Sequence, residues 1–581
     1  MPRSRRSFAT IAAGLVANEA ATDDSPKHRS KLSILVLIVI LSVSSVLYYA
    51  ALAPERFGSY HDDSIYATTA RALANGQGYR IISLPSEPAQ TKYPPFYPLL
   101  LSLIWKAHSQ FPQNVVWMTM LSCLAALSFL ALTYRYLTSR GYSTPFQALI
   151  VVGLAAANWR TIILATGMYS EMLFAALSVA ALCLAERDAS KEGIWFNRLL
   201  LGIILGLAFL TRTSGLVLLL SVGIYYALHK RWRAAAAVMF IGGLFVLGWV
   251  WWCYVNKTNV DGINTAYYTS YLGHLKQTVA DMQASGSSSA LTAYLKIILT
   301  NFIGGVLVSV PLVCSGLNYG WMPSFGGSSV IAVFFLLLVF LVLVMAFVKH
   351  ISRGVRLLHV YLISSFAIYL LWLPGVAYDR FMMPLLPFLL VFLVSGFDLQ
   401  ISLARRELSC GGQPARKMGA AFIMCIFLAA IGLGLYSYGA GVYWVFATSK
   451  SSVRAEEDAQ ASAWIAERTD PSETLVCYRD PKYFLYTGHK AVRSLPMAGG
   501  YSWGEDDVSM SKLAAGVFRI IEEANARYLV VTSTDFELED NPEQHRKTFN
   551  LLIERHPQKF ILVFKSFDSG SRIYRIQSAQ T

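Results

Sequence analysis

Two neighbouring carboxylates, Asp62 and Asp63, follow the first long apolar segment of the chain. A carboxylate within hydrogen-bond reach of a hydroxyl group can act as a general base. Adjacent residues point in different directions, so the two acids need not share one reacting centre, and a single base is enough for a direct displacement. The alternative interpretation is structural, because both acids precede a predicted helix over residues 65–75 and could stabilise its N-terminus.

Few other charged residues stand outside the basic loops of the chain, and four of them are candidates for the same site. Charges at membrane depth are costly and usually line a cavity or a pathway. The basic members of this set could take up the negative charge of a phosphate leaving group. We therefore predict that they share one hollow with the two aspartates. The four residues are Lys92, Glu171, Arg212 and Arg380.

Each of these residues also has a structural interpretation. Lys92 could extend to the membrane interface. Arg212 could form an ion pair with Glu171, and Arg380 could pair with its neighbour Asp379. These alternatives stay open at the level of sequence.

A metal site is not predicted. His61 beside the two aspartates lacks convincing ligand spacing, and a divalent cation is the less favoured alternative. The seven cysteines include no CxxC pair and read as small core residues. The sequence therefore indicates no specific cofactor.

The composition of the 581-residue chain is that of a membrane protein. Hydrophobic residues make up 55% of it and charged residues 14%, and the mean hydropathy is +0.45. Apolar runs near the roughly 20 residues that cross a bilayer recur between residues 31 and 449. We predict a polytopic α-helical membrane protein with about 11–13 transmembrane or re-entrant helices.

The distribution of charge predicts the orientation. Basic residues before the first span place an arm over residues 1–30 in the cytoplasm, so the first loop, residues 54–95, is outside. Short basic loops recur on the cytoplasmic side, and every charged candidate then lies at the outer side. The segment 300–323 must begin and end outside, either as a re-entrant hairpin or at the interface. Breaks near residues 158–171 and 212 predict an outward hollow.

The last part of the chain, residues 450–581, is predicted to be a soluble extracytoplasmic α/β domain. Helices are expected over 456–467, 508–524 and 542–555, and strands over 474–478, 528–532, 560–564 and 572–576. From Arg454 onwards the chain holds 16 basic and 19 acidic residues, leaving 33 basic and 16 acidic residues elsewhere. The net charge of +14 therefore belongs to the membrane loops, and nucleic acid is not an expected partner.

Several segments together resemble the C-type (GT-C fold) membrane glycosyltransferases, which include the protein O-mannosyltransferases and the lipid A aminoarabinose transferases. In that superfamily the first acid of a pair in loop one is the catalytic candidate, which maps onto Asp62, and a nearby tyrosine maps onto Tyr66. A lysine directly before Pro-Pro is thought to hold donor phosphate in the aminoarabinose branch, and Lys92 stands one position earlier. The segments are YHDDSIYA at 60–67, KYPPFYPL at 92–99, YSEMLF at 169–174, TRTSGL at 211–216 and RFMMPLLP at 380–387.

The resemblance implies an inverting enzyme that takes a sugar from a polyprenyl-phosphate carrier. The partners would be that donor, membrane lipids and an acceptor, which could be protein, lipid or polysaccharide. The expected location is the plasma (inner) membrane. Two other classes stay open: a lipid or glycan transporter without glycosyl transfer, and a membrane scaffold whose outer domain binds glycans.

Overall fold

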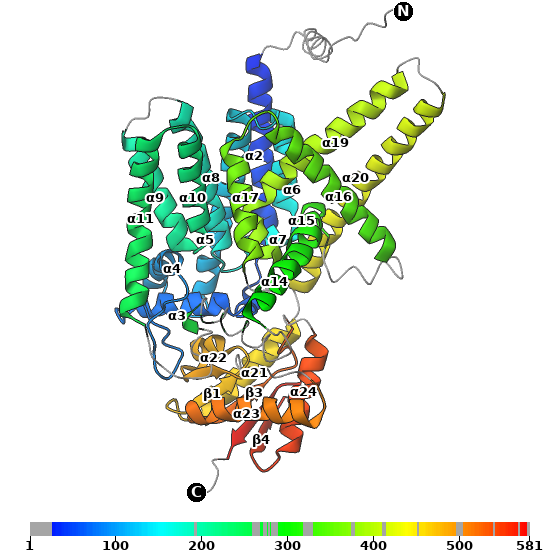
Figure 1. Cartoon of the computed structure of the whole chain (residues 1–581). Coiled ribbons are helices and arrows are strands. Elements are labelled where there is room, and N and C mark those ends of the chain that lie inside the picture. Colours follow the sequence, from blue (N-terminus) through cyan, green and yellow to red (C-terminus); the bar gives the residue numbers. More distant parts are fainter. Residues whose placement is uncertain are drawn as a thin grey trace, which may run out of the picture.

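The computed structural model describes most of the chain. The described residues are 26–190, 195–257, 268–270, 273, 276, 279, 289–317, 329–372, 378–409, 414–449, 452–495, 504–537, 541–566 and 570–577. A helical body holds the first three quarters of the sequence, and a small α/β domain lies at one end of it (Figure 1). The predicted arm over residues 1–30 lies largely outside the described residues.

Long apolar helices build the body. Among the described residues, seven helical segments are long and apolar enough to cross a membrane, or eight if one bent pair counts as a single span. Shorter apolar helices such as α9, α10 and α17 pack among them, and the multi-span helical fold predicted from the sequence is confirmed. The helices are α2 (Pro26–Ala50), α5 (Asn114–Ser139), α6 (Pro145–Ala157), α7 (Trp159–Ala165), α8 (Glu171–Ser190), α9 (Trp195–Thr211), α10 (Gly215–Leu228), α11 (Trp232–Val255), α14 (Ala290–Asn301), η2 (Phe302–Ser309), α15 (Val310–Ser315), α16 (Ser329–Ile351), α17 (Leu357–Leu370), α18 (Tyr378–Met382), η5 (Met383–Leu385), α19 (Leu386–Ser409) and α20 (Pro414–Ser449).

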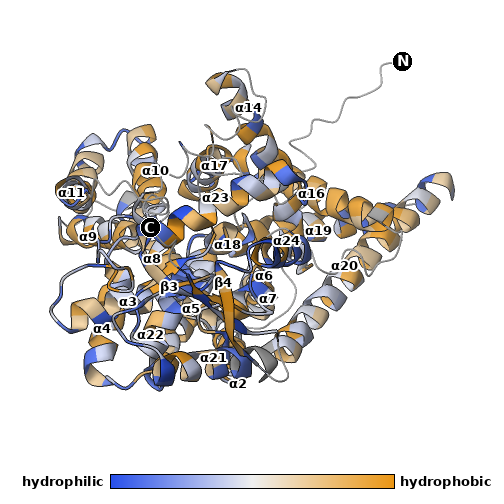
Figure 2. Ribbon diagram, turned by 90° about the horizontal axis from the view of Figure 1, so that it is seen from below, coloured by the Kyte–Doolittle hydropathy of each residue, from blue (hydrophilic) through white to orange (hydrophobic). Residues whose placement is uncertain are grey.

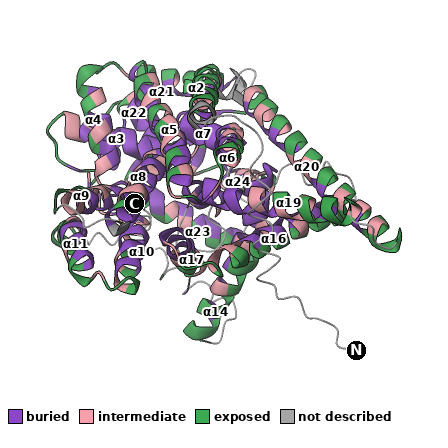
Figure 3. Ribbon diagram, turned by 90° about the horizontal axis from the view of Figure 1, so that it is seen from above, coloured by how far each residue is buried: buried purple, intermediate pink, exposed green. Residues whose placement is uncertain are grey.

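The outer helices expose apolar side chains, as a surface in contact with lipid requires. Phe240 and Leu247 of α11 and Phe422 of α20 are exposed. Figure 2 shows apolar residues on the outer helices around the more polar α/β domain, and Figure 3 shows exposed residues at the rim of the body and buried ones at its centre. Hydrophobic residues exposed on this scale indicate that the outer surface of the body contacts a bilayer rather than water.

Two interruptions in the helices confirm the breaks predicted from the sequence. Helices α6 and α7 are bent by 64° around Asn158, whose side chain accepts a hydrogen bond from the Arg160 amide and so begins the second helix. Helix α9 ends at Thr211 and α10 begins at Gly215, which leaves Arg212 at the tip of a hairpin. Both interruptions lie at the end of the body that faces the α/β domain (Figure 1).

The segment predicted over 300–323 is longer than expected at its start. Residues Ala290–Ser315 form one apolar helical run of 26 residues, long enough to cross a membrane. Its middle has π-helical geometry over Phe302–Ser309. The residues that follow, 318–328, lie outside the described part, so the predicted return to the same side stays a prediction.

Loop one runs across the end of the body. It contains η1 (Pro54–Arg56) and α3 (Asp62–Ala74), and α4 (Phe96–Ala107) follows it directly. Helix α3 lies between the body and the α/β domain (Figure 1). Nine of its thirteen residues are buried, including Asp63 and Tyr66. The loop is therefore an ordered layer that both parts of the protein cover.

The C-terminal domain is a five-stranded sheet between helices. Its strand order is β2-β1-β3-β5-β4, with β1 parallel to β2 and β3, and β5 antiparallel to β3 and β4. Helix α21 covers one face, and α23 and α24 cover the other. The elements are α21 (Ser452–Arg468), β1 (Thr474–Cys477), α22 (Asp480–Thr487), β2 (Ala491–Arg493), α23 (Asp507–Glu523), β3 (Ala526–Val531), α24 (Pro542–Arg555), β4 (Phe560–Lys565) and β5 (Arg572–Ile576).

Every helix and strand predicted for this domain is present within a few residues. Helix α22 and strand β2 were not predicted. Both lie on the side that meets loop one: the Ala491 amide donates to the Ser83 carbonyl, and Lys490 bonds the Ile82 carbonyl and pairs with Glu87. The two missed elements therefore form part of the junction between the α/β domain and loop one.

Candidate functional site

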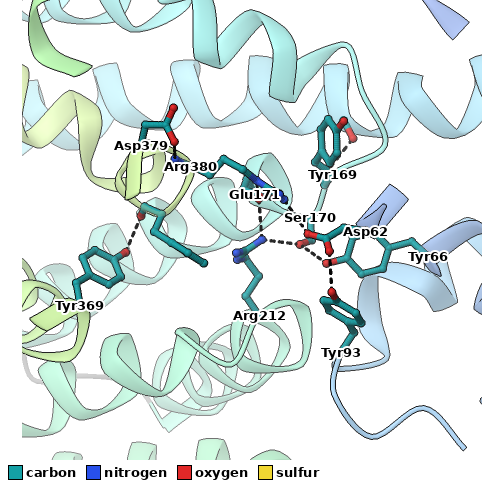
Figure 4. Close-up of polar contacts among 12 residues, drawn as sticks. Asp62, Tyr66, Tyr93, Tyr169, Ser170, Glu171, Arg212, Tyr369, Asp379 and Arg380 are labelled. Carbon is teal, nitrogen blue, oxygen red and sulfur yellow. Dashed lines mark hydrogen bonds and ion pairs between the residues drawn. The ribbon is translucent and has the colours of Figure 1, made fainter. Parts of the chain in front are cut away.

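The candidate site is a cluster of charges at the N-terminus of α3 (Figure 4). Asp62 accepts a hydrogen bond of 2.6 Å from the Tyr93 hydroxyl and pairs at 3.1 Å with the Arg380 guanidinium. Burial alone would raise the pKa of Asp62, but Arg380, the Tyr93 hydrogen bond and Lys92 outweigh it and hold the pKa below its usual range. The carboxylate is therefore ionised at neutral pH.

Glu171 joins two arginines that come from distant parts of the chain. Its Oε1 atom lies 2.5 Å from Arg380 and 3.0 Å from Arg212. The side chain of Glu171 is only 1% exposed, whereas that of Asp62 is 22% exposed. Glu171 thus acts as a buried counter-ion, and Asp62 is the accessible acid of the cluster.

The alternative pairings suggested by the sequence are resolved by these contacts. Arg212 does pair with Glu171. The Arg380 side chain does not pair with its neighbour Asp379. The carboxylate of Asp379 pairs with Arg160 of α7, and from Arg380 it accepts a hydrogen bond from the backbone amide. The Arg380 guanidinium is left to bridge Asp62 and Glu171, because Arg160 neutralises Asp379.

A hydroxyl pair links the cluster to loop one. The Tyr66 hydroxyl lies 3.1 Å from the Ser170 hydroxyl, which accepts a hydrogen bond of 3.0 Å from Arg212. Tyr66 also packs edge-on against Tyr93 and Tyr97. The tyrosine predicted for the site therefore stands beside Arg212 and holds the ring that bonds Asp62.

A cavity of about 220 Å³ opens next to these residues. Tyr66, Tyr93 and Arg212 form its polar end. Its remaining walls are mostly apolar and come from α10, α17 with the residues that follow it, and α18; Leu216, Val217, Ile368, Trp372 and Phe381 are among them. The cavity is therefore suited to a molecule with one anionic or polar end and an apolar remainder.

Lys92 is buried near the cluster rather than extended to the interface. Its ammonium group lies 5.3 Å from the centre of the Tyr93 ring. The buried side chain of Gln90 fixes this turn, because its Oε1 atom accepts the amides of both Lys92 and Tyr93. Burial, only partly opposed by Asp62, lowers the pKa of Lys92 to about 8.

Asp63 is not part of the cluster. Its two oxygens accept the backbone amides of Gly58 at 2.8 Å and Ser64 at 2.7 Å. Burial raises its pKa to about 6 despite these hydrogen bonds. The two aspartates thus point in different directions, as expected, and the structure gives Asp63 a role in holding loop one. It also lines a second cavity of about 320 Å³ next to η1 and α7.

The described residues contain no group of three or more His, Cys, Asp or Glu side chains that could hold a metal ion. The ring of His61 turns away from Asp62 and meets Asp480 of the α/β domain at 2.7 Å.

Several residues of the site were not singled out from the sequence. The residue types of Tyr93, Ser170 and Asp480 do not by themselves indicate a functional role, because tyrosine, serine and aspartate are common in proteins. Tyr93 follows Lys92 directly and Ser170 precedes Glu171, so each stands next to a predicted residue. Asp480 has no such neighbour.

Comparisons with known proteins bear on the family and the fold. Residues 91–374 match the model of Glycosyltransferase family 87. The crystal structure of ArnT from Cupriavidus metallidurans bound to undecaprenyl phosphate is similar with a TM-score of 0.52 at 13% identity, over 93% of this chain and 97% of that chain. The oligosaccharyltransferase of Archaeoglobus fulgidus, tethered to an acceptor peptide, is similar with a TM-score of 0.51 at 11% identity, over 93% of this chain and 74% of that chain. No curated protein matches the chain.

Proposed function

Since the chain has the fold of the C-type membrane glycosyltransferases and matches family 87 over residues 91–374, we propose that it is a glycosyltransferase with a polyprenyl-phosphate sugar as donor. The acceptor hydroxyl belongs to a protein, a lipid or a polysaccharide. The reaction takes place at the extracytoplasmic face of the plasma membrane. The basic loops on the opposite side of the body support this orientation.

One observation carries the proposal: the only accessible carboxylate of the charged cluster, Asp62, stands beside a cavity that has arginine at its polar end. Tyr93 bonds Asp62 and also lines that cavity. The proposed base, Asp62, and the proposed cation for the phosphate leaving group, Arg212, therefore both stand next to Tyr93. A transporter has no need for this arrangement, whereas displacement of a phosphate requires both groups.

The cavity between α10 and α17 is the proposed donor site. Its apolar walls accommodate the first part of a prenyl chain, whose remainder extends into lipid. Arg212 faces the phosphate, and Lys92 adds positive charge on the loop-one side. ArnT, which shares the fold, was crystallised with undecaprenyl phosphate, and this is consistent with a lipid-phosphate donor here.

The proposed chemistry is a single displacement. The acceptor oxygen attacks the anomeric carbon while Asp62 takes its proton, and the bond between that carbon and the phosphate oxygen breaks. The electron pair of that bond leaves with the polyprenyl phosphate, whose charge Arg212 and Lys92 stabilise. One attack from the face opposite the phosphate inverts the configuration, and no covalent sugar–enzyme intermediate forms.

The experiment is transfer by the purified protein in detergent or liposomes. Polyprenyl-phosphate sugars with a radiolabelled sugar are incubated with candidate acceptor lipids, peptides and polysaccharides, and the anomeric configuration of the product is determined by NMR. We expect labelled product of inverted configuration from the wild type and none from Asp62→Asn. Movement of donor across a liposome bilayer without any transfer, equal in both proteins, would support a transporter instead.

A further inference from the structure

The residue before Asp62 has a backbone conformation that only a few residues in proteins adopt. His61 has φ 63° and ψ −44°, and the Asp62 amide donates to the Tyr60 carbonyl at 2.7 Å. An i to i+2 hydrogen bond around a residue with positive φ is a γ-turn of the rarer, strained form. Such a turn persists in a residue with a side chain only where the surroundings hold it.

This turn determines where the neighbouring side chains point. Tyr60 and Asp62 both reach Arg380: the guanidinium lies 5.4 Å from the centre of the Tyr60 ring and 3.1 Å from the Asp62 carboxylate. His61 between them points the opposite way, into the α/β domain. In a helical backbone, where each residue is turned by about 100° from the one before, Tyr60 and Asp62 would point in nearly opposite directions. The turn folds the chain back at His61, so both side chains reach Arg380 while α3 begins at Asp62.

The α/β domain supplies the group that holds the turn. Asp480, the first residue of α22, bonds the His61 ring at 2.7 Å through one oxygen and accepts the Tyr268 hydroxyl at 2.7 Å through the other. Asp480 is fully buried, and His61 is nearly so. Next to it, Lys482 packs against Gly58, which also has positive φ. The start of α22 thus contacts both positive-φ positions of the turn region, His61 and Gly58.

Resting on the proposed glycosyl transfer, we propose that Asp480 is a positioning residue: it holds His61 in the strained turn that directs Asp62 to the reacting centre. The C-terminal domain is therefore a working part of the active site, although none of its residues needs to touch the sugar. Loss of the Asp480 contact lets His61 relax to negative φ, and the Asp62 carboxylate then moves away from Arg380 and Tyr93.

Glycine provides a direct test, because it adopts positive φ without a steric penalty. Asp480→Ala should lower kcat by about tenfold or more, as expected for a lost buried hydrogen bond to a charged group, with the KM for the donor changed by less than about twofold. His61→Gly combined with Asp480→Ala should recover kcat to within about threefold of the wild type, because the turn no longer needs its clamp. A purely structural role for Asp480 predicts no such rescue.

The control is Glu87→Gln, which weakens another contact between loop one and the α/β domain, that with Lys490, away from the turn. It should leave kcat unchanged. A double variant as impaired as Asp480→Ala, or an Asp480→Ala protein with wild-type kcat, would overturn the proposal. If Asp480→Ala does not fold, Asp480→Asn, which keeps the side-chain volume, replaces it as the single variant and in combination with His61→Gly. The kcat of the double variant should again exceed that of the single variant.

Failure of the proposed function is distinguished by a measurement without substrate. Hydrogen exchange of the amides of residues 62–66 should be faster in Asp480→Ala and return towards the wild-type rate in the double variant. If the wild type transfers no sugar but this exchange pattern holds, the glycosyl transfer is wrong and the clamp is right. If transfer occurs and exchange is the same in all variants, the clamp is wrong.

Discussion

Exchanging Asp62 and Asp63 separately for asparagine distinguishes the two neighbouring acids. Asp62→Asn removes the base but keeps the volume, and one side-chain oxygen can still accept from Tyr93 or Arg380. Arg380 keeps its 2.5 Å contact with Glu171, so the cluster should stay folded. A positioned general base contributes roughly 10²–10⁴-fold to a rate, and we expect kcat to fall by about this factor with little change in the KM for the donor.

Asp63→Asn should act on stability instead. Burial raises the pKa of Asp63 from 3.8 to about 6, so the folded protein binds this proton more tightly than the unfolded chain. Stability is thus lost as pH rises from about 4 to 6, by about 3 kcal/mol for a change of this size. Asparagine removes this dependence, but its single oxygen can replace only one of the two amide contacts, at a cost of about 1–3 kcal/mol. The melting temperature of the variant should therefore vary less with pH between 4 and 6, and its kcat should stay within about fivefold of the wild type.

The assay is steady-state transfer from a labelled polyprenyl-phosphate sugar, with melting temperatures measured in the same detergent at several pH values. The expected result is an inactive, stable Asp62→Asn protein and an active Asp63→Asn protein with altered stability. The reverse order, in which Asp63→Asn abolishes transfer without a change in melting temperature and Asp62→Asn transfers normally, would refute the assignment of the base.

Three further outcomes follow from the site. The kcat/KM for the donor should fall as pH rises through about 8, because Lys92 is charged only below its lowered pKa. Lys92→Arg should move this decline beyond pH 10. A pH profile that is the same in both proteins would exclude Lys92 from donor binding. Arg212→Ala should raise the KM for the donor by about tenfold or more, whereas Arg212→Lys should recover part of this loss; equal KM values in all three proteins would contradict the phosphate contact. A chain ending after Ser449 should lose at least as much transfer as Asp480→Ala, because it lacks Asp480 and the other contacts of the α/β domain with loop one, and activity equal to that of the wild type would show that the α/β domain is dispensable.

The C-terminal domain shows which elements a sequence can predict. Helix α24 begins with Pro542 at a favoured first position and carries apolar residues at helical spacing, and β5 contains Ile573, Tyr574 and Ile576, residue types that favour strands, so both were predicted at their observed bounds. Strand β2 has only three residues, and α22 has two turns with no clear apolar period. Contacts with loop one stabilise these two elements, and local sequence carries little information about such contacts.

The charged cluster was predictable in membership but not in pairing. Charges inside an apolar chain are rare, and the predicted topology placed Asp62, Glu171, Arg212 and Arg380 on one side. Which acid meets which base depends on the packing of helices far apart in sequence. Arg160, on the short helix after the 64° bend, binds Asp379 and so frees Arg380 for Glu171. A three-dimensional outcome of this kind has no local signature.

The contacts between loop one and β2 connect the order of synthesis to the appearance of activity. Ile82 of loop one and Lys490 are 408 positions apart in the chain. During translation, loop one emerges before the α/β domain, so under the proposed clamp the acid-bearing turn lacks its support until that domain has been synthesised and folded. The nascent protein should therefore insert and pack its helices while still unable to consume lipid-linked sugar. Folding of the α/β domain onto loop one would then be the step at which the proposed activity appears.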